Sequence, residues 1–352
     1  MNKIIKEMTL EDKIALCSGK DFWQTKSFEK YGIPSIYMSD GPHGLRKQDV
    51  GKGTDMLGVN KSFPATCFPS EVTTASSFDA ELLEEIGSAI GKEAKQLNVA
   101  LTLGPGANIK RNPLCGRNFE YFSEDPYVSG KLAASFIKGI EKEGIGSSLK
   151  HFACNSQEFD RFTSNSVLSD RALREIYLKA FEIAVKEGKP STVMCAYPKL
   201  NDVHCSDNKL LLNDILRDEW GFDGIVVTDW GAMNNRIEGF RAGCDLNMPG
   251  GSDFMEKDVK EAVYKHELDE ECIDKSVDRI LNFVLKDRES TNNDCHENNH
   301  NIALKAALKG AVLLKNDDKI LPLNLNSEKV GIVGYMAKHM RYQGSGSSHI
   351  NP

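Results

Sequence analysis

Residues 223–230, DGIVVTDW, combine a short apolar run with a carboxylate at its end. The run itself, 225–228, is continuous rather than alternating, as in strands that are buried on both faces of a parallel sheet. Asp229 and Trp230 follow directly where such a strand would end. Burial of a carboxylate there costs free energy, so we expect it to have a functional role or cationic neighbours. The stretch therefore predicts a central strand, with Asp229 as either a nucleophile or a cap of the next βα loop.

Four further apolar runs have the same character as 225–228. They lie at 35–39, 99–103, 147–149 and 192–195. Segments with helical periodicity alternate with them, and these predict helices at 80–97, 129–143, 170–187, 209–220 and 270–286. Such alternation is typical of parallel βα units and predicts an α/β fold. Both a (β/α)8 barrel and an open α/β sheet fit this pattern.

Polar side chains follow several of these runs, at the point where each predicted strand ends: Asp40, Lys150, His151 and Tyr197. The carboxyl ends of the strands form the active site of a (β/α)8 barrel and the ligand crevice of an open α/β sheet. In either architecture these side chains would converge with Asp229, although they are far apart in the sequence.

Each candidate also has an ordinary structural explanation. Asp40, before Gly-Pro, fits a tight turn as well as a carboxylate that accepts hydrogen bonds from sugar hydroxyls. Lys150 would pair with a core carboxylate, hold hydroxyls, or form a Schiff base if its pKa were depressed. Arg117, in the loop 116–126, fits a surface ion-pair cluster or a fork that bridges vicinal hydroxyls. Spacing alone does not decide between these readings.

The composition excludes several classes of protein. With 44 Lys and Arg against 51 Asp and Glu, the 352-residue chain has a formal charge of −7, which is atypical of proteins that bind nucleic acid or anionic membranes. No apolar run approaches the roughly 18 residues of a membrane helix, and the N-terminus lacks the apolar core of a signal peptide. The nine cysteines include no C-x-x-C pair, so we expect reduced thiols in a cytoplasmic protein. Cys295, His296 and His300 are too few for a zinc site, and no cofactor or metal is expected.

A polar stretch divides the chain. Residues 287–301, DRESTNNDCHENNHN, contain no aliphatic side chain and predict an exposed linker after a first unit at 1–286. The remainder, 302–352, holds one helix-like segment and one run typical of a buried strand, KVGIVGY at 329–335. One helix and one strand cannot bury a core of their own. We therefore expect 302–352 to be the beginning of a second α/β domain, with exposed apolar surface near 330–333.

Taken together, six segments resemble the family 3 glycoside hydrolases, the β-glucosidase family. These segments are 8–13 (MTLEDK), 39–46 (SDGPHGLR), 103–108 (LGPGAN), 116–126 (GRNFEYFSEDP), 150–152 (KHF) and 223–232 (DGIVVTDWGA). The resemblance runs through essentially the whole chain. It implies a (β/α)8 TIM-type barrel at 1–286, in which the first strands can be irregular. It also implies that 302–352 is the truncated start of an α/β sandwich domain.

The resemblance assigns roles to the strand-end residues. It implies that Asp229 is the catalytic nucleophile and that Trp230 is the stacking platform for the sugar ring. The residues that it implies as further contacts to the sugar are Asp40, Arg117, Lys150, His151, Met194 and Tyr197. Residues 153–161, ACNSQEFDR, lack the Pro-Gly-His-Gly signature of the family's N-acetylglucosaminidase branch. This departure favours a glucosidase-like branch.

The implied reaction is retaining hydrolysis of terminal non-reducing β-D-glucosyl residues. Asp229 would attack the anomeric carbon, and a second carboxyl group about 5 to 5.5 Å away would protonate the leaving oxygen. The pKa of that second group has to be raised while the pKa of Asp229 stays low. In the glucosidase branch the second group is a Glu from the domain after the barrel, of which this chain resembles only the start. Glu120 and Glu158 are the local substitutes.

Three other functions stay open on the sequence alone. The first is a sugar-binding domain with negligible turnover. The second is a Schiff-base lyase or aldolase that uses Lys150. The third is a subunit whose tail at 341–352 docks a partner that completes the site. The expected partners are a small-molecule β-glycoside and a C-terminal sandwich domain, from the same polypeptide or from another chain. Neither nucleic acid nor a membrane is expected as a partner.

Overall fold

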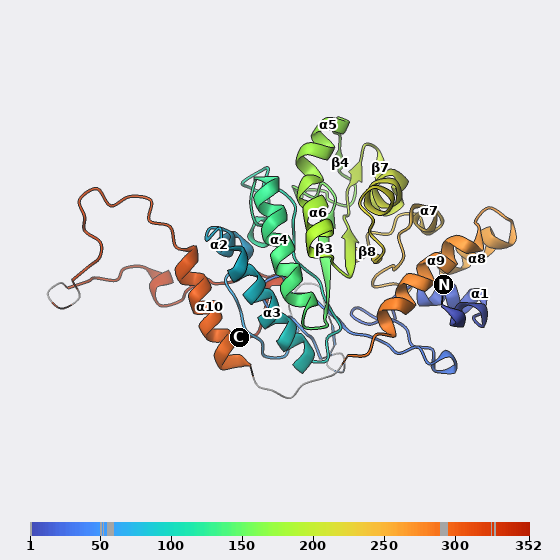
Figure 1. Cartoon of the computed structure of the whole chain (residues 1–352), viewed down its shortest axis with the longest axis horizontal. Helices are drawn as coiled ribbons and strands as arrows, with labels where there is room; N and C mark the ends of the chain where they lie inside the picture. Colours follow the sequence, from blue (N-terminus) through green and yellow to red (C-terminus); the bar gives the residue numbers. More distant parts are fainter. Residues whose placement is uncertain are drawn as a thin grey trace.

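The computed structural model describes residues 2–49, 51, 53–54, 60–288, 295–324, 326 and 329–352. Its centre is a parallel sheet of five strands in the order β1-β2-β3-β5-β8 (Figure 1). These strands are β1 Met38–Ser39, β2 Leu101–Thr102, β3 Gly146–Phe152, β5 Thr192–Cys195 and β8 Ile225–Thr228. A separate small sheet holds β4 Asn165–Ser166, β6 Lys199–Leu200 and β7 Val203–His204.

The central sheet curls until its two edges are joined by backbone bridges. The bridges that complete the ring pair Val227 with Leu246, Asn247 with Ser18, Gly19 with Thr25, and Gln24 with Tyr37, which directly precedes β1. The last two pairings are antiparallel, so the ring closes through an irregular hairpin near the N-terminus. The predicted α/β fold with a TIM-like barrel is confirmed, although in the described ranges only five regular strands form the continuous sheet.

Helices cover the outside of the curled sheet (Figure 1). The longer ones are α3 Ala80–Gln96, α4 Pro126–Glu141, α8 Asp253–Tyr264, α9 Glu270–Val284 and α10 His296–Gly310, and the shorter ones are α1 Leu10–Leu16, α2 Glu71–Ala75, α5 Asp170–Ala172, α6 Lys179–Ile183 and α7 Arg236–Ala242. Three π-helical segments are η5 Leu173–Tyr177, η6 Ala184–Gly188 and η8 Leu210–Glu219, and the 3-10 turns include η4 Asn118–Glu120 and η10 Gly346–Ser348. Of the helices that the structure describes, none combines the length and the apolar character needed to cross a bilayer.

Most predicted elements are confirmed, and the differences follow from burial. β5 and β8 have the predicted bounds, whereas β3 is longer than the predicted 147–149. Lys150 and His151 therefore lie inside β3 rather than after it. The strand begins with glycine and two serines that are fully buried, so its apolar signal in the sequence is weak. The predicted helices appear as α3, α4, the segment from α5 to η6, η8 and α9, while α1, α2, α7 and α8 were not predicted.

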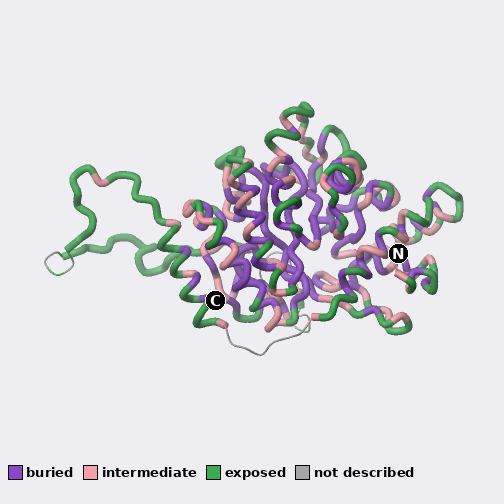
Figure 2. The backbone as a smooth tube through the Cα atoms, in the orientation of Figure 1, coloured by how far each residue is buried: buried purple, intermediate pink, exposed green. Residues whose placement is uncertain are grey.

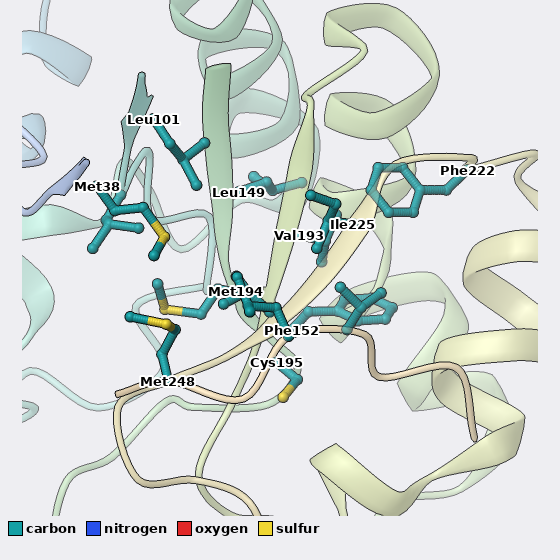
Figure 3. Close-up of a cluster of buried hydrophobic side chains, with 14 of the residues drawn as sticks. Met38, Leu101, Leu149, Phe152, Val193, Met194, Cys195, Phe222, Ile225 and Met248 are labelled. Carbon is teal, nitrogen blue, oxygen red and sulfur yellow. The ribbon is translucent and has the colours of Figure 1, made fainter. Parts of the chain in front are cut away.

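The core of the barrel is a set of apolar side chains contributed by each strand of the ring. Met38, Leu101, Leu149, Val193 and Ile225 come from the five strands and belong to the buried apolar cluster shown in Figure 3. Each is at most 3% exposed. Close packing of this kind fixes strand positions because cores tolerate few voids. The strand ends, which carry the candidate site residues, therefore rest on a rigid base.

The helix α10 packs against α2 and α3 at the edge of the barrel (Figure 1). It begins at His296, six residues before the predicted start at Ile302, so residues 296–301 of the predicted linker are helical. Asn299 is fully buried there, and its amide donates to Oε1 of Glu93 at 2.9 Å. This tertiary contact outweighs the low helix propensity of asparagine. Residues 289–294 of the predicted linker lie outside the described residues.

After α10 the chain leaves the barrel, and the described part of 311–340 is almost entirely exposed (Figure 2). The predicted buried strand at 329–335 is wrong, because residues 329–334 form no regular element, Tyr335 begins a 3-10 turn and, within the described part of the chain, no strand pairs with them. The predicted exposed apolar surface is confirmed: Val330, Ile332 and Val333 are 54%, 79% and 95% exposed. The final residues then return to the barrel, where Ile350 is only 1% exposed.

Candidate active site

A pocket of about 360 Å³ opens at the carboxyl ends of the barrel strands. All eight predicted site residues line it: Asp40, Arg117, Lys150, His151, Met194, Tyr197, Asp229 and Trp230. They come from β3, from β5, and from the segments that follow β1, β2, β5 and β8. The predicted convergence of strand ends is therefore observed in space.

Asp229 is positioned by the backbone around the end of β8. Its N–H donates to the carbonyl of Cys195 at 3.0 Å, and its Oδ1 accepts from the N–H of Trp230 at 2.8 Å. Its Oδ2 lies 3.6 Å from Nη1 of Arg117 and 3.6 Å from Nε2 of His151. One oxygen is thus anchored, and the other points toward cationic and hydrogen-bonding groups.

The charge on Asp229 is set by burial and by two neighbouring cations. Exclusion of water raises the pKa of its carboxyl above the ordinary value of 3.8, and Arg117 and Lys150 oppose this shift. The expectation that the pKa of Asp229 stays low is wrong in direction, because desolvation outweighs the cations. Ionisation of Asp229 in the folded protein therefore costs free energy.

Lys150, Arg117 and Glu120 form a buried ionic network under the pocket. The Nζ of Lys150 lies 3.3 Å from Oε2 of Glu120 and 3.5 Å from Oδ1 of Asp40, and Nε of Arg117 donates to Oε1 of Glu120. Burial opposes the charge of Lys150, but Glu120 and Asp40 outweigh it and raise the pKa of the lysine. A Schiff-base lysine needs a depressed pKa, so the lyase alternative is contradicted by the charge balance at this residue.

His151 is a neutral, rigidly held imidazole. Burial lowers its pKa well below 6.5, and the charges of Arg117 and Lys150 lower it further. Its Nδ1 lies 3.2 Å from the hydroxyl of Tyr121, and its backbone N–H donates to Oδ1 of Asn108 at 2.7 Å. The free Nε2 edge is thereby directed at Asp229.

Aromatic side chains form the other wall of the pocket. The rings of Trp23 and Trp230 lie 5.6 Å apart, and the indole N–H of Trp230 donates to the carbonyl of Phe22 at 2.6 Å. The hydroxyl of Tyr197 donates to the carbonyl of Trp230 at 2.9 Å. The indole ring of Trp230 is therefore held by its N–H, and its backbone is held by Tyr197, as a stacking surface requires.

The two glutamates considered as local acids are both held by cations. Burial disfavours the charge on Glu120, yet Arg117 and Lys150 outweigh it and lower its pKa. Glu158 lines the pocket, but its Oε2 accepts from Arg161 at 2.7 Å and its Oε1 accepts from Asn155 at 2.9 Å. An ion-paired carboxylate is a poor proton donor, so neither glutamate is suited to the role of general acid.

Several lining residues were not predicted as site residues: Trp23, Leu103, Gly116, Phe119, Arg161, Ser345 and Gly346. Trp23 belongs to the irregular hairpin that closes the barrel, which leaves no periodic signal in the sequence. Ser345 and Gly346 belong to the returning tail, about 35 positions after α10 ends, and only the tertiary fold brings them here. For Trp23, the only sequence feature that could have suggested a role in the pocket is its aromatic side chain.

Comparison with known proteins identifies the family. The model of the glycosyl hydrolase family 3 N terminal domain matches residues 49–283, which is well over half of the chain. The chain belongs to glycosyl hydrolase family 3. The matched range includes seven strands of the structure and seven of the eight predicted site residues, with Asp40 just outside it.

Relatives of this family 3 chain are similar over its full length. Thermostable beta-glucosidase B of Acetivibrio thermocellus is 51% identical over 100% of the chain and 47% of its own length. An exo-alpha-(1->6)-L-arabinopyranosidase of Bifidobacterium longum is 44% identical over 99% of the chain and 47% of its own length. The chain spans about half the length of the curated relatives it matches.

Solved structures agree with the sequence relatives. A family 3 β-glucosidase of Bifidobacterium adolescentis is 42% identical with a TM-score of 0.90, over 100% of this chain and 50% of that one. Beta-glucosidase 3B of Thermotoga neapolitana, solved in complex with alpha-D-glucose, is 40% identical with a TM-score of 0.85, over 92% of this chain and 48% of that one. The fold of this family 3 chain is therefore the fold of the N-terminal half of such enzymes.

Proposed function

We propose that this chain carries the sugar site and the nucleophile of a retaining β-glycosidase that acts on terminal non-reducing β-D-glucosyl residues. The observation that carries the proposal is the setting of Asp229. Its Oδ2 is buried, lacks a hydrogen-bond partner among the described residues and lies 3.6 Å from both Arg117 and His151 at the base of the pocket. A buried carboxylate oxygen without a partner is costly unless a ligand meets it.

In the proposed reaction, Oδ2 of Asp229 attacks the anomeric carbon and the bond to the aglycone oxygen breaks. A general acid gives its proton to that oxygen, which leaves as an alcohol. Water then attacks the glycosyl-enzyme ester, gives its proton to the same group, and releases the sugar with overall retention. The Arg117 cation would keep Asp229 ionised and stabilise the carboxylate when it leaves the sugar.

The remaining pocket residues would position the glucosyl ring. Asp40 and Lys150, paired at 3.5 Å, offer one acceptor and one donor to neighbouring hydroxyls, and the Nε2 edge of His151 offers a further contact. Trp230 would stack on the apolar face of the ring. Arg117, Met194 and Tyr197 complete the wall. The names of the relatives support a glucosyl or arabinopyranosyl substrate.

We also propose that the general acid comes from a C-terminal α/β sandwich domain, supplied by the rest of the polypeptide or by another chain. The relatives are about twice as long as this chain. Residues 302–352 would be the opening of that domain, after a barrel at 1–286. A cytoplasmic location belongs to the same proposal. All nine cysteines lie in the described ranges and none forms a disulfide, as is usual for reduced compartments.

A second candidate function is sugar binding without turnover by this half alone. The ion pairing of Glu120 and Glu158 favours it, because both carboxylates are engaged by cations. The two candidates differ in their response to a leaving group that needs no proton.

The experiment is intact mass after incubation with a 2-deoxy-2-fluoro-β-glucoside that carries a dinitrophenolate leaving group. This group departs without protonation, so the first step needs no general acid. A stable adduct on a peptide that contains Asp229 supports the proposed nucleophile. Absence of an adduct in folded protein that still binds glucosides supports the second candidate and overturns the first.

A further inference from the structure

A second buried pair of ionisable side chains lies outside the pocket of Asp229. His43 and Glu71 are each only 2% exposed, and Nδ1 of His43 lies 3.7 Å from Oε2 of Glu71. Within the described residues, neither ring nitrogen and neither carboxylate oxygen has a hydrogen-bond partner. Charge attraction is therefore the contact that offsets the cost of burying this pair, and it acts only while the imidazole is protonated.

The surroundings of His43 keep its imidazole charged at neutral pH. Burial opposes the charge, but Cys67 and Glu71 outweigh burial and raise the pKa of His43 to about 9. Two cations also face this region. Lys110 is attracted to Glu71, although burial lowers the pKa of the lysine to about 8, and Arg341 lines the same cavity as His43. The pair is thus ionic at neutral pH and loses the charge of His43 as the pH rises through about 9.

His43 lies at the tip of the loop that follows β1 and that carries Asp40. A backbone bridge joins Asp40 to Arg46, and the N–H of Arg46 donates to the carbonyl of Asp40 at 2.8 Å. At the tip, the carbonyl of His43 accepts from the N–H of Phe68 at 2.9 Å. Because this loop is short and closed at its base, a displacement of His43 would also displace Asp40.

The same pair contacts the turn that carries two residues of the ionic network. The ring of His43 lies 6.0 Å from the ring of Phe119 in an edge-to-face arrangement at 88°. The helix α2, which begins at Glu71, also contacts η4. Phe119 lines the pocket and is followed directly by Glu120, while Arg117 directly precedes η4. The pair thus lies between the loop after β1 and this turn.

We propose that the buried His43–Glu71 ion pair is a positioning element that holds the Asp40 loop and the Arg117 turn at the spacing that the sugar site needs. The inference rests on the proposed function, because the segments that it joins are those of the proposed sugar site. Neither side chain lines the pocket of Asp229, so both act through these segments. Loss of either charge leaves the other charge buried without its partner, which would move the two segments or admit water.

The test is the pH dependence of glucoside affinity, measured by calorimetry from about pH 6 to about pH 10 with thermal unfolding at each pH. The ligand is methyl thio-β-D-glucoside, whose sulfur bridge resists hydrolysis, so the measurement does not depend on turnover. We expect the affinity of the folded chain to fall about tenfold as the pH rises through about 9, because the site residues move apart. A constant affinity up to about pH 10 in folded protein would overturn the inference without the need for any variant.

Substitutions of the pair test whether its charges act together. Glu71→Gln removes the counter-charge of His43, so the alkaline fall in affinity should move to lower pH. His43→Gln leaves Glu71 buried without its partner and should bind about tenfold more weakly at neutral pH. The double variant, His43→Gln with Glu71→Gln, leaves neither charge, so it should recover the affinity and lose the alkaline fall. A double variant as weak as His43→Gln alone would overturn the role of the ion pair.

Two control variants identify the titrating group. Lys110→Met removes the other group near the pair that titrates in this range and should keep the alkaline fall. His300→Gln changes an exposed histidine of α10 and should behave like the unmodified chain. A fall that disappears in Lys110→Met but persists in the double variant would assign it to the lysine and overturn the inference.

The outcomes also separate this inference from the proposed function. Labelling of Asp229 by the fluoroglucoside, together with an affinity that does not change near pH 9, overturns the role of the pair and leaves the nucleophile standing. The expected pH dependence without any labelling keeps the pair and overturns the nucleophile. Failure of the unmodified chain to bind the thioglucoside at any pH overturns both inferences.

Discussion

The Oδ2 atom of Asp229 lies 3.6 Å from Nε2 of His151, and neither atom has a hydrogen-bond partner within the described residues. Both side chains are buried, and the imidazole is held neutral by a lowered pKa. Arg117, whose Nη1 lies 3.6 Å from Oδ2, offsets only part of the desolvation cost of these two buried atoms. A sugar that bridges them would recover that cost on binding.

Replacement of the nucleophile should separate binding from chemistry. We expect Asp229→Asn to abolish adduct formation with the fluoroglucoside, by a factor of at least about 10³ in rate. The amide Oδ1 still accepts from the N–H of Trp230, so the pocket keeps its shape. Intact mass against time is the measurement, with Asp223→Asn, an exposed carboxylate just before β8, as the control. Labelling of the Asp229→Asn variant at the normal rate would refute the assignment.

The same variant should be more stable than the unmodified chain at neutral pH. Burial places the folded pKa of Asp229 above its ordinary value of 3.8, so the ionised form destabilises the fold. This penalty is absent below pH 3.8 and grows as the pH rises through the folded pKa. The substituted amide carries no charge, so Tm should rise by about 2 °C at pH 7 and converge with that of the unmodified chain in acid. A lower Tm at pH 7 would contradict the raised pKa.

Glu120, the buried glutamate of the ionic network, should stabilise the fold at neutral pH, whereas the ionised Asp229 destabilises it. Glu120→Gln removes the counter-charge of Arg117 and Lys150 and should lower the free energy of unfolding by about 3 kcal/mol at pH 7. Because the folded pKa of Glu120 is depressed, its contribution is present above the unfolded value of 4.5 and is lost as the pH falls through the folded pKa. Urea unfolding at about pH 7 and at a series of pH values below 4.5 should show the difference shrinking as Glu120 becomes protonated.

The control for this measurement is Glu187→Gln. Glu187 pairs with Lys131 at 2.7 Å, but both side chains are about 40% exposed. Exposed pairs contribute only about 0.2 to 1 kcal/mol, so this variant should change stability little at either pH. Equal effects of the two substitutions would show that burial does not set the strength of the Glu120 network.

Most of the site residues that the sequence predicted lie in regular strands or just after them, and Arg117, on the long loop after β2, is the exception. Asp229 and Tyr197 follow strands whose bounds, 225–228 and 192–195, are read directly from continuous apolar runs. Burial on both faces enforces that pattern, so position along the strand predicts position in the pocket. The roles of these residues came from the resemblance to a family, since spacing alone left a structural explanation open for each.

The missed parts depend on tertiary contacts. Trp23 sits on a hairpin that closes the barrel through isolated bridges, and Ser345 sits on a tail that returns after a long exposed excursion. Neither has a periodic pattern that a window of neighbouring residues could reveal. The run at 329–335 is the opposite case, because the sequence predicted a strand there that does not form. Its apolar pattern is typical of a strand, but pairing requires a neighbouring strand, which the described residues do not supply.

The exposed apolar segment should make this chain bind hydrophobic dyes. Ile332 and Val333 are 79% and 95% exposed, next to other exposed apolar side chains. A double substitution, Ile332→Ser with Val333→Ser, should reduce dye fluorescence without a change in Tm, because neither side chain packs on the barrel. Dye binding by the unmodified chain at the level of an ordinary folded domain would contradict the exposure of this segment.

The returning tail is anchored by the buried residues Ser348 and Ile350 and by a set of hydrogen bonds. The amide of Gln343 donates to the carbonyl of Ile350 at 2.9 Å, and the N–H of Ile350 donates back to Oε1 of Gln343 at 2.8 Å. Asn351 donates from its side chain to Ser62 at 2.8 Å. A Cβ on Gly44 would lie 2.8 Å from Cδ1 of Ile350, so the isoleucine is seated directly on the glycine. These contacts lie on either side of the two tail residues that line the pocket.

Ile350→Ala should therefore release the tail and weaken the sugar site without unfolding the barrel. Removing a buried isoleucine costs about 2 to 5 kcal/mol, which exceeds what a short docked segment can lose and remain bound. We expect faster amide exchange across 343–351 and weaker binding of methyl thio-β-D-glucoside, with the barrel transition unchanged. Val333→Ala, at a site 95% exposed, is the control and should change neither. Faster exchange with unaltered glucoside affinity would show that the tail lines the pocket without contributing to the sugar site.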